Sequence, residues 1–94
     1  MKKILLIFIF LYTLALSATV DDGLKALNDG DYIKALEILE NNKDNKAAQF
    51  NLGIMYKNGY GVKKDLLKSK DYLFKSCQGG LVGACSAYDT LNFK

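Results

Sequence analysis

Residues 47–65, which read AAQFNLGIMYKNGYGVKKD, carry the strongest fold signal in the chain. Apolar residues recur three and four positions apart over 46–56, and this spacing predicts a helix. They cover two faces of that helix, a pattern typical of a helix packed between neighbours. Gly53 lowers helix propensity there by about 1 kcal/mol relative to alanine. We therefore expect another helix backbone to come close to Gly53.

Four more helices are expected around this central one. Residues 32–40 show helical spacing of apolar residues and follow Asp31, a good N-cap. Asp65 is expected to cap the next helix in the same way. Turn residues separate these segments, and none of them shows convincing strand-like alternation. The chain is therefore predicted to be all-α and built from αα-hairpins. The expected segments are 21–28, 32–40, 66–77 and 81–93.

The chain also repeats itself. Residues 31–35, DYIKA, are echoed 34 positions later by residues 65–69, DLLKS. Ala48 is echoed 36 positions later by Ala84. A period of this length with two helices in each unit is typical of an α-solenoid.

A set of small, apolar and turn residues at fixed spacing lies within this repeat: Ala48, Leu52, Gly53, Tyr56, Gly59, Gly61, Val62, Asp65, Ser69 and Ser76. In these residues the chain resembles the Sel1-like repeat family, a relative of the tetratricopeptide (TPR) repeat. The family usually has alanine where Ser69 and Ser76 stand here, and serine is also small enough for close helix contact. The resemblance implies an αα-hairpin solenoid of about two and a half repeats. Its expected parts are a TPR-like hairpin at 19–45, a Sel1-like repeat at 46–80 and a C-terminal capping helix at 81–94.

The first residues read MKKILLIFIFLYTLALSA and predict a signal peptide over 1–18. Lys2 and Lys3 precede an apolar run, and small residues follow it, with cleavage expected after Ser17 or Ala18. The apolar run is shorter than the roughly 18–20 residues that span a bilayer. An uncleaved membrane anchor is the alternative. The expected location is the bacterial periplasm or the cell exterior, with membrane contact only through an uncleaved leader.

The two cysteines, Cys77 and Cys85, lie at the end of one expected helix and the start of the next. This spacing resembles the Helicobacter cysteine-rich proteins, secreted Sel1-like repeat proteins with disulfide-linked helix hairpins. The pair is too widely spaced for a CxxC redox site, and the chain has no histidine to activate a thiol. In an oxidising compartment we expect a disulfide. Two buried free thiols remain the alternative.

Composition argues against several other functions. The chain has no arginine, and the charge beyond the leader is close to balanced, so nucleic-acid binding is not expected. Without histidine, two cysteines cannot form a four-ligand zinc site within one chain, and we expect no metal or other cofactor. The cysteine-rich family is labelled as penicillin-binding or β-lactamase proteins, so a β-lactam-binding protein or weak β-lactamase is the alternative function. No serine is followed three positions later by lysine, so no catalytic residue is assigned.

The leading expectation is a non-catalytic protein-interaction module. In TPR-like solenoids the first helix of each pair lines the concave face, and this resemblance places Phe50, Asn51, Ile54 and Lys57 in the groove. Phe50 and Ile54 would hold an apolar anchor, Asn51 would bind peptide backbone, and Lys57 would meet a carboxylate. The alternative is that Phe50 and Ile54 are core residues. The expected partner is a protein or peptide, and a second copy of the chain is possible.

Overall fold

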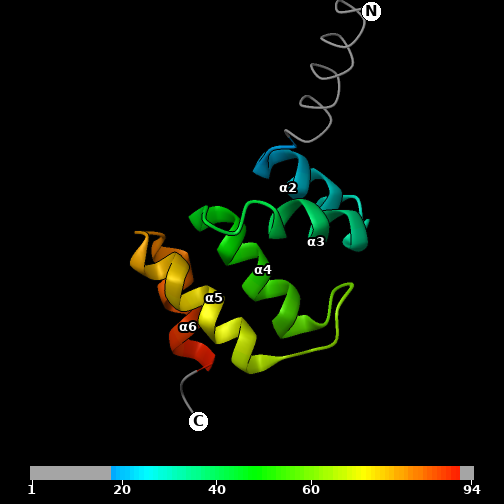
Figure 1. Cartoon of the computed structure of the whole chain (residues 1–94). Coiled ribbons are helices and arrows are strands. Elements are labelled where there is room, and N and C mark those ends of the chain that lie inside the picture. The colour runs from blue at the N-terminus through cyan, green and yellow to red at the C-terminus, as the bar shows by residue number, and fades with distance from the viewer. Residues whose placement is uncertain (1–17, 92–94) are drawn as a thin grey trace, which may run out of the picture.

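The computed structural model describes residues 18–91, which form five helices and no strand. The helices are α2 (Val20–Asn28), α3 (Tyr32–Glu40), α4 (Lys46–Asn58), α5 (Leu66–Gln78) and α6 (Val82–Leu91). Figure 1 shows α4 in the middle of the chain, between the α2–α3 pair and the α5–α6 pair. The predicted all-α class is therefore confirmed for the described residues.

The predicted helix ends are close to the observed ones. The helix at 32–40 has the bounds of α3, and the others differ by one or two residues at the ends that can be compared. The central helix continues past Tyr56 to Asn58, because Gly59 is the first residue with left-handed backbone, at φ 73°. The last helix begins at Val82 rather than Leu81. Most of the predicted leader, and Phe93, lie outside the described residues.

Side-chain caps fix where the helices begin. Asp31 Oδ1 accepts a hydrogen bond from the Lys34 amide at 3.3 Å, and Asp65 Oδ1 accepts one from the Lys68 amide at 3.0 Å, which confirms both predicted N-caps. Asn45 caps α4 by accepting from the amide of Ala47 at 2.8 Å. Only Asp31 and Asp65 were predicted as caps, so the cap at Asn45 is an additional finding.

Small residues let α4 and α5 pack closely. A methyl group at Gly53 would lie 2.7 Å from Cγ of Leu73 and 3.3 Å from the Ser69 carbonyl oxygen, so the expected close approach is present. The Ser69 hydroxyl donates to the Gly53 carbonyl at 2.6 Å, and the Ser76 hydroxyl donates to the Lys46 carbonyl at 2.6 Å. Both serines are fully buried, and their hydroxyls are satisfied by backbone of the neighbouring helix.

The core runs through the centre of this arrangement. Helix α4 packs against α5, α3 and α2, and α6 packs against α5. The loop after α4 is held against the first pair of helices by Tyr60, whose ring stacks on Tyr32 at 4.8 Å. Within residues 18–91, no helix is both long and apolar enough to cross a membrane. The buried core cluster consists of Ala26, Ala35, Leu39, Ala48, Leu52, Met55, Tyr56 and Tyr72.

Candidate binding surfaces

The four predicted binding residues lie on α4. Phe50, Asn51, Ile54 and Lys57 are all partly buried. Neither Phe50 nor Ile54 belongs to the buried core cluster of the described residues. Asn51 donates its side-chain amide to the Ala47 carbonyl at 2.8 Å, so part of its hydrogen-bonding capacity is used within α4. We call Phe50, Asn51, Ile54 and Lys57 the α4 strip.

A cavity of about 580 Å³ opens between α2, the turn after α3 and the start of α4. We call it the α2–α4 cavity. Its polar lining consists of Thr19, Asp21, Asn41, Asn42 and Asn45, and its apolar lining consists of Ala18, Val20, Leu24 and Ala47. None of the α4 strip residues lines this cavity. Ala47, however, lies one helical turn before Asn51 and two turns before Ile54, on the same side of the helix.

Hydrogen bonds hold the asparagines of the α2–α4 cavity in place. The Asn42 side-chain nitrogen donates to the carbonyls of Ala18 at 3.2 Å and Ile38 at 2.8 Å, which leaves its side-chain oxygen as an acceptor. Asn45 is oriented by capping α4. None of these residues was predicted to bind a ligand, because the run NNKDN at 41–45 is also typical of a polar turn. The three asparagines at 41, 42 and 45 were the available signal.

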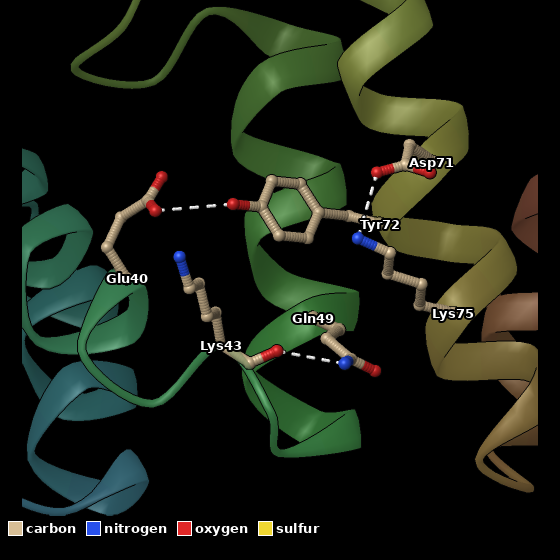
Figure 2. A network of polar contacts seen from close by, with 6 residues as sticks. All are labelled: Glu40, Lys43, Gln49, Asp71, Tyr72 and Lys75. Atoms are coloured by element: carbon tan, nitrogen blue, oxygen red, sulfur yellow. Dashed lines mark hydrogen bonds and ion pairs between the residues drawn. The ribbon is translucent and has the colours of Figure 1, made fainter.

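A polar network joins three helices on another side of α4. Glu40, at the end of α3, accepts hydrogen bonds from the hydroxyls of Tyr56 at 3.1 Å and Tyr72 at 3.2 Å. Figure 2 shows Tyr72 reaching from α5 across α4 towards Glu40. The two tyrosine rings stack at 5.9 Å, and the Lys68 ammonium lies 4.7 Å from the centre of the Tyr56 ring. No residue of this network was predicted as a site.

Burial keeps one of these tyrosines protonated. Removal from water, together with the charge of Glu40 and the hydrogen bond to it, raises the pKa of Tyr72 to about 12. Its hydroxyl therefore stays a hydrogen-bond donor to a higher pH than that of an ordinary tyrosine. The geometry gives Tyr72 a structural role, because its hydroxyl is committed to the Glu40 carboxylate.

A smaller cleft of about 270 Å³ adjoins this network between the turn after α3 and α5. Lys43, Lys68 and Lys75 line it together with Asp44 and Asp71, so its charges are mixed. The Lys75 ammonium lies 3.2 Å from the Asp71 carboxylate, with both side chains more than half exposed (Figure 2). An exposed pair of this kind contributes little to stability.

The cysteines lie together at the junction of α5 and α6. Cys77 is near the end of α5 and Cys85 is in α6, with their Cα atoms 4.7 Å apart and their sulfurs at bonding distance. The pair is compatible with the expected disulfide. Both residues are only partly buried, which differs from the alternative of two buried thiols.

The described residues do not assemble a recognisable catalytic centre. The Ser69 and Ser76 hydroxyls are buried and donate to backbone carbonyls. Residues 18–91 contain no group of three or more histidine, cysteine, aspartate or glutamate side chains arranged to hold a metal ion. Comparison with protein-family models, with curated proteins and with solved structures finds no match. The function is therefore inferred from the residues and their geometry.

Proposed function

We propose that this chain is a secreted or periplasmic Sel1-like repeat protein that binds a protein or peptide ligand through α4 and does not act as a catalyst. The observation that carries the proposal is the α4 strip. Phe50 and Ile54 are large apolar residues on the central helix, and they remain partly accessible while the rest of that helix supplies much of the buried core. Partly exposed apolar residues on a rigid support are suited to anchor a partner.

The α4 strip lies on a helix that is held in place by packing against three other helices. The other sides of α4 bury Ala48, Leu52, Met55 and Tyr56, and its neighbours are α2, α3 and α5. A ligand that packs on Phe50 and Ile54 would therefore meet a preorganised surface, which lowers the entropy cost of association. Lys57, at the end of the strip, offers a positive charge to a carboxylate of the ligand.

A recurring helix contact supports the repeat interpretation. Leu39 in α3 packs against Gly23 in α2, where an added methyl group would lie 2.8 Å from Leu39 Cδ2. Leu73 in α5 packs against Gly53 in α4 in the same manner. The two leucines are 34 residues apart and the two glycines are 30 apart, because the turn between α4 and α5 is longer than the turn between α2 and α3. One glycine-to-leucine contact in each hairpin is what two copies of a single repeat unit would produce.

Binding studies with matched variants test this proposal. The chain is used as bait for cross-linking in a periplasmic extract, alongside Phe50→Ala, Ile54→Ala and Leu67→Ala. Leu67 lies on α5 and is 80% exposed, so its truncation removes a comparable apolar side chain away from the strip. We expect the partner to be lost from Phe50→Ala and Ile54→Ala and retained by Leu67→Ala, with circular dichroism verifying that each variant is folded. Equal capture by all four proteins would refute the α4 surface.

A further inference from the structure

Most of the large apolar side chains that are exposed in residues 18–91 lie along one edge of the molecule. Ile33 is 76% exposed in the first turn of α3, and Leu67 is 80% exposed in the first turn of α5. Leu66 precedes Leu67, and Tyr60 lies in the loop before α5; they are 44% and 36% exposed. Of the six such side chains, the other two lie further along α5 and on α6.

The loop between α4 and α5 joins the two helix starts into a single edge. The Tyr60 ring stacks on Tyr32, the first residue of α3. A methyl group at Gly61 would lie 2.8 Å from Cβ of Tyr32, so the loop backbone is in contact with the start of α3. Figure 1 shows this loop running from the end of α4 to the start of α5 on the side where α3 begins. We call residues 31–34 and 59–68 the loop edge.

The two most exposed aliphatic residues of the loop edge occupy equivalent places in the repeat. Ile33 and Leu67 are 34 residues apart, and each stands two positions after the aspartate that caps its helix. None of the three described cavities is lined by Ile33, Leu66, Leu67 or Tyr60. These side chains therefore protrude from the edge and do not form the walls of a groove.

Lysines accompany the apolar side chains. Each exposed aliphatic residue is followed by a lysine, and the loop contributes two more. These exposed lysines are Lys34, Lys63, Lys64 and Lys68. The carboxylates of the loop edge are those of Asp31 and Asp65, and both accept a hydrogen bond from a helix amide. Lysines stay in the majority when Asp29 of the preceding turn is counted, whereas residues 18–91 as a whole carry ten lysines and ten acidic residues. The loop edge therefore attracts an anionic surface more than the rest of the molecule does.

We propose that the loop edge docks on an anionic lipid bilayer, with Ile33, Leu66 and Leu67 entering the interface and the lysines meeting headgroup phosphates. Leucine and isoleucine bury apolar surface there, tyrosine is enriched at membrane–water interfaces, and lysines are attracted to anionic lipids. A fluid lipid surface closes around separate protruding side chains, whereas a protein partner would need a matching pocket for each.

This contact is peripheral, because no helix within residues 18–91 is long and apolar enough to cross a membrane. It differs from the membrane contact expected from the sequence, which involves only the leader. It is also independent of the proposed ligand site, because none of the α4 strip residues belongs to the loop edge.

Sedimentation with vesicles tests the apolar part of the loop edge. The chain from Ala18 onward, which contains every described helix, is mixed with vesicles of phosphatidylcholine or of equal parts phosphatidylcholine and phosphatidylglycerol. We expect binding to the anionic vesicles that Ile33→Ser or Leu67→Ser weakens roughly tenfold and Val82→Ser leaves unchanged. Val82 is 76% exposed, like Ile33, but lies on α6. Circular dichroism verifies that each protein is folded. No binding, or equal losses in all three variants, would overturn the proposal.

Two double variants with the same change in net charge test the lysines. Lys63→Gln with Lys64→Gln removes two charges from the loop edge, and Lys43→Gln with Lys75→Gln removes two from the cleft beside α5. We expect only the first pair to weaken binding to the anionic vesicles, by roughly tenfold. Equal effects of the two pairs, or equal binding to both kinds of vesicle, would contradict docking on an anionic surface.

Fluorescence reports whether the loop edge enters the bilayer. The chain has no tryptophan, so Leu67→Trp and Val82→Trp each introduce a single probe. We expect the emission of Leu67→Trp to shift to shorter wavelength with anionic vesicles, and that of Val82→Trp to stay unchanged. Binding without this shift would overturn the proposal. Capture of a protein that depends on Ile33 and Leu67, without vesicle binding, would assign the edge to a protein partner instead.

Discussion

Glu40 joins three helices through its two carboxylate oxygens. One oxygen accepts from Tyr56 on α4 and the other from Tyr72 on α5, while Glu40 itself ends α3. The sequence around Glu40 gives no sign of this role, because its two partners lie 16 and 32 positions away along the chain. A single residue type in a helical pattern gives no indication of such distant partners.

Tyr72 should titrate at a higher pH than an ordinary tyrosine. Its pKa is raised from 10 in the unfolded chain to about 12 in the fold, so the folded state favours the protonated form. Its contribution to stability is therefore complete below pH 10 and is lost as the pH rises from about 10 to about 12. Tyrosinate absorbance should show a step near pH 12 that Tyr72→Phe removes. If Tyr72→Phe instead removed a step at the ordinary tyrosine pKa, the burial of Tyr72 beside Glu40 would be contradicted.

The two buried serines, Ser69 and Ser76, should not support β-lactam hydrolysis. Ser69 and Ser76 are fully buried. The Ser69 hydroxyl donates to the Gly53 carbonyl, and the Ser76 hydroxyl donates to the Lys46 carbonyl. A nucleophilic serine needs an accessible hydroxyl and a neighbouring base. We expect purified protein to turn over nitrocefin at the rate of a Ser69→Ala, Ser76→Ala double variant. Hydrolysis by the wild-type chain alone would show that one of these serines is a nucleophile.

At the scale of the elements, helix packing rather than helix propensity decides which glycines are required. Gly53 in α4 and Gly83 in α6 both lower the stability of their helix, because glycine has a lower helix propensity than alanine. Their surroundings differ, because a methyl group at Gly53 would meet Leu73 at 2.7 Å whereas nothing lies within 4 Å of one at Gly83. The sequence indicated a close neighbour at Gly53 because the glycine interrupts a strong helical pattern.

Alanine at these two positions should therefore have opposite effects. Gly53→Ala gains helix propensity but forces Leu73 and the α5 backbone away, and we expect a net loss of about 1–3 kcal/mol in the free energy of unfolding. Gly83→Ala adds no contact and should gain about 0.5–1 kcal/mol. Urea denaturation of both variants provides the measurement. Stabilisation by both substitutions would mean that α4 and α5 are not in close contact at this point.

Helix α6 should depend on the cysteine pair. Ala84 is its only fully buried side chain among the described residues, and the other notable contact is the Phe74–Tyr88 ring pair at 5.5 Å. Closing so short a loop stabilises the fold by roughly 2–3 kcal/mol in the chain-entropy model. We expect the purified oxidised chain to be lighter than the reduced one by the mass of two hydrogens. Reduction should raise amide hydrogen exchange in α6 before it does so in α3 and α4.

Two outcomes would count against this role for the pair. Full reduced mass in protein purified without reductant would show two free thiols. Unchanged exchange in α6 after complete reduction would show that packing alone holds the helix. The Cys77→Ser, Cys85→Ser double variant separates loss of the bond from effects of the reductant, and it should match the reduced wild-type chain.

For the whole molecule, local patterns were sufficient for the helices but not for the surfaces between them. The helical spacing and the Asp31 and Asp65 caps placed α3 and α5 closely, because these signals lie within a few residues of each other. The α2–α4 cavity and the Glu40 network depend on how separate helices meet. How the helices meet is set by packing between side chains that are far apart in the chain, and the helical spacing of apolar residues does not show these contacts. The α4 strip was placed by resemblance, and its binding role remains a prediction.

The contacts of Ala18 and Thr19 bear on the expected cleavage of the leader. Ala18 and Thr19 directly precede α2, and Thr19 is its N-cap. The Thr19 amide donates to the Asp22 carboxylate at 2.9 Å, and the Ala18 carbonyl accepts from Asn42 at 3.2 Å. Cleavage after Ala18 would place the new ammonium of Thr19 beside Asp22, where a charged donor strengthens the same hydrogen bond. Cleavage after Ser17 would preserve both contacts.

Cleavage after Ser17 keeps the hydrogen bond from Asn42 to Ala18, whereas cleavage after Ala18 removes it. We expect the chain expressed with its own first residues in a bacterium to be recovered from the periplasm with Ala18 or Thr19 first. Intact mass and N-terminal sequencing distinguish the two ends. Asp22→Asn should lower the stability of the Thr19 form more than that of a chain that keeps residues 1–18, because only the Thr19 form has an ammonium to lose its partner. Recovery of the uncleaved chain in the membrane fraction would instead support the anchor, and would place the α2–α4 cavity near the bilayer surface.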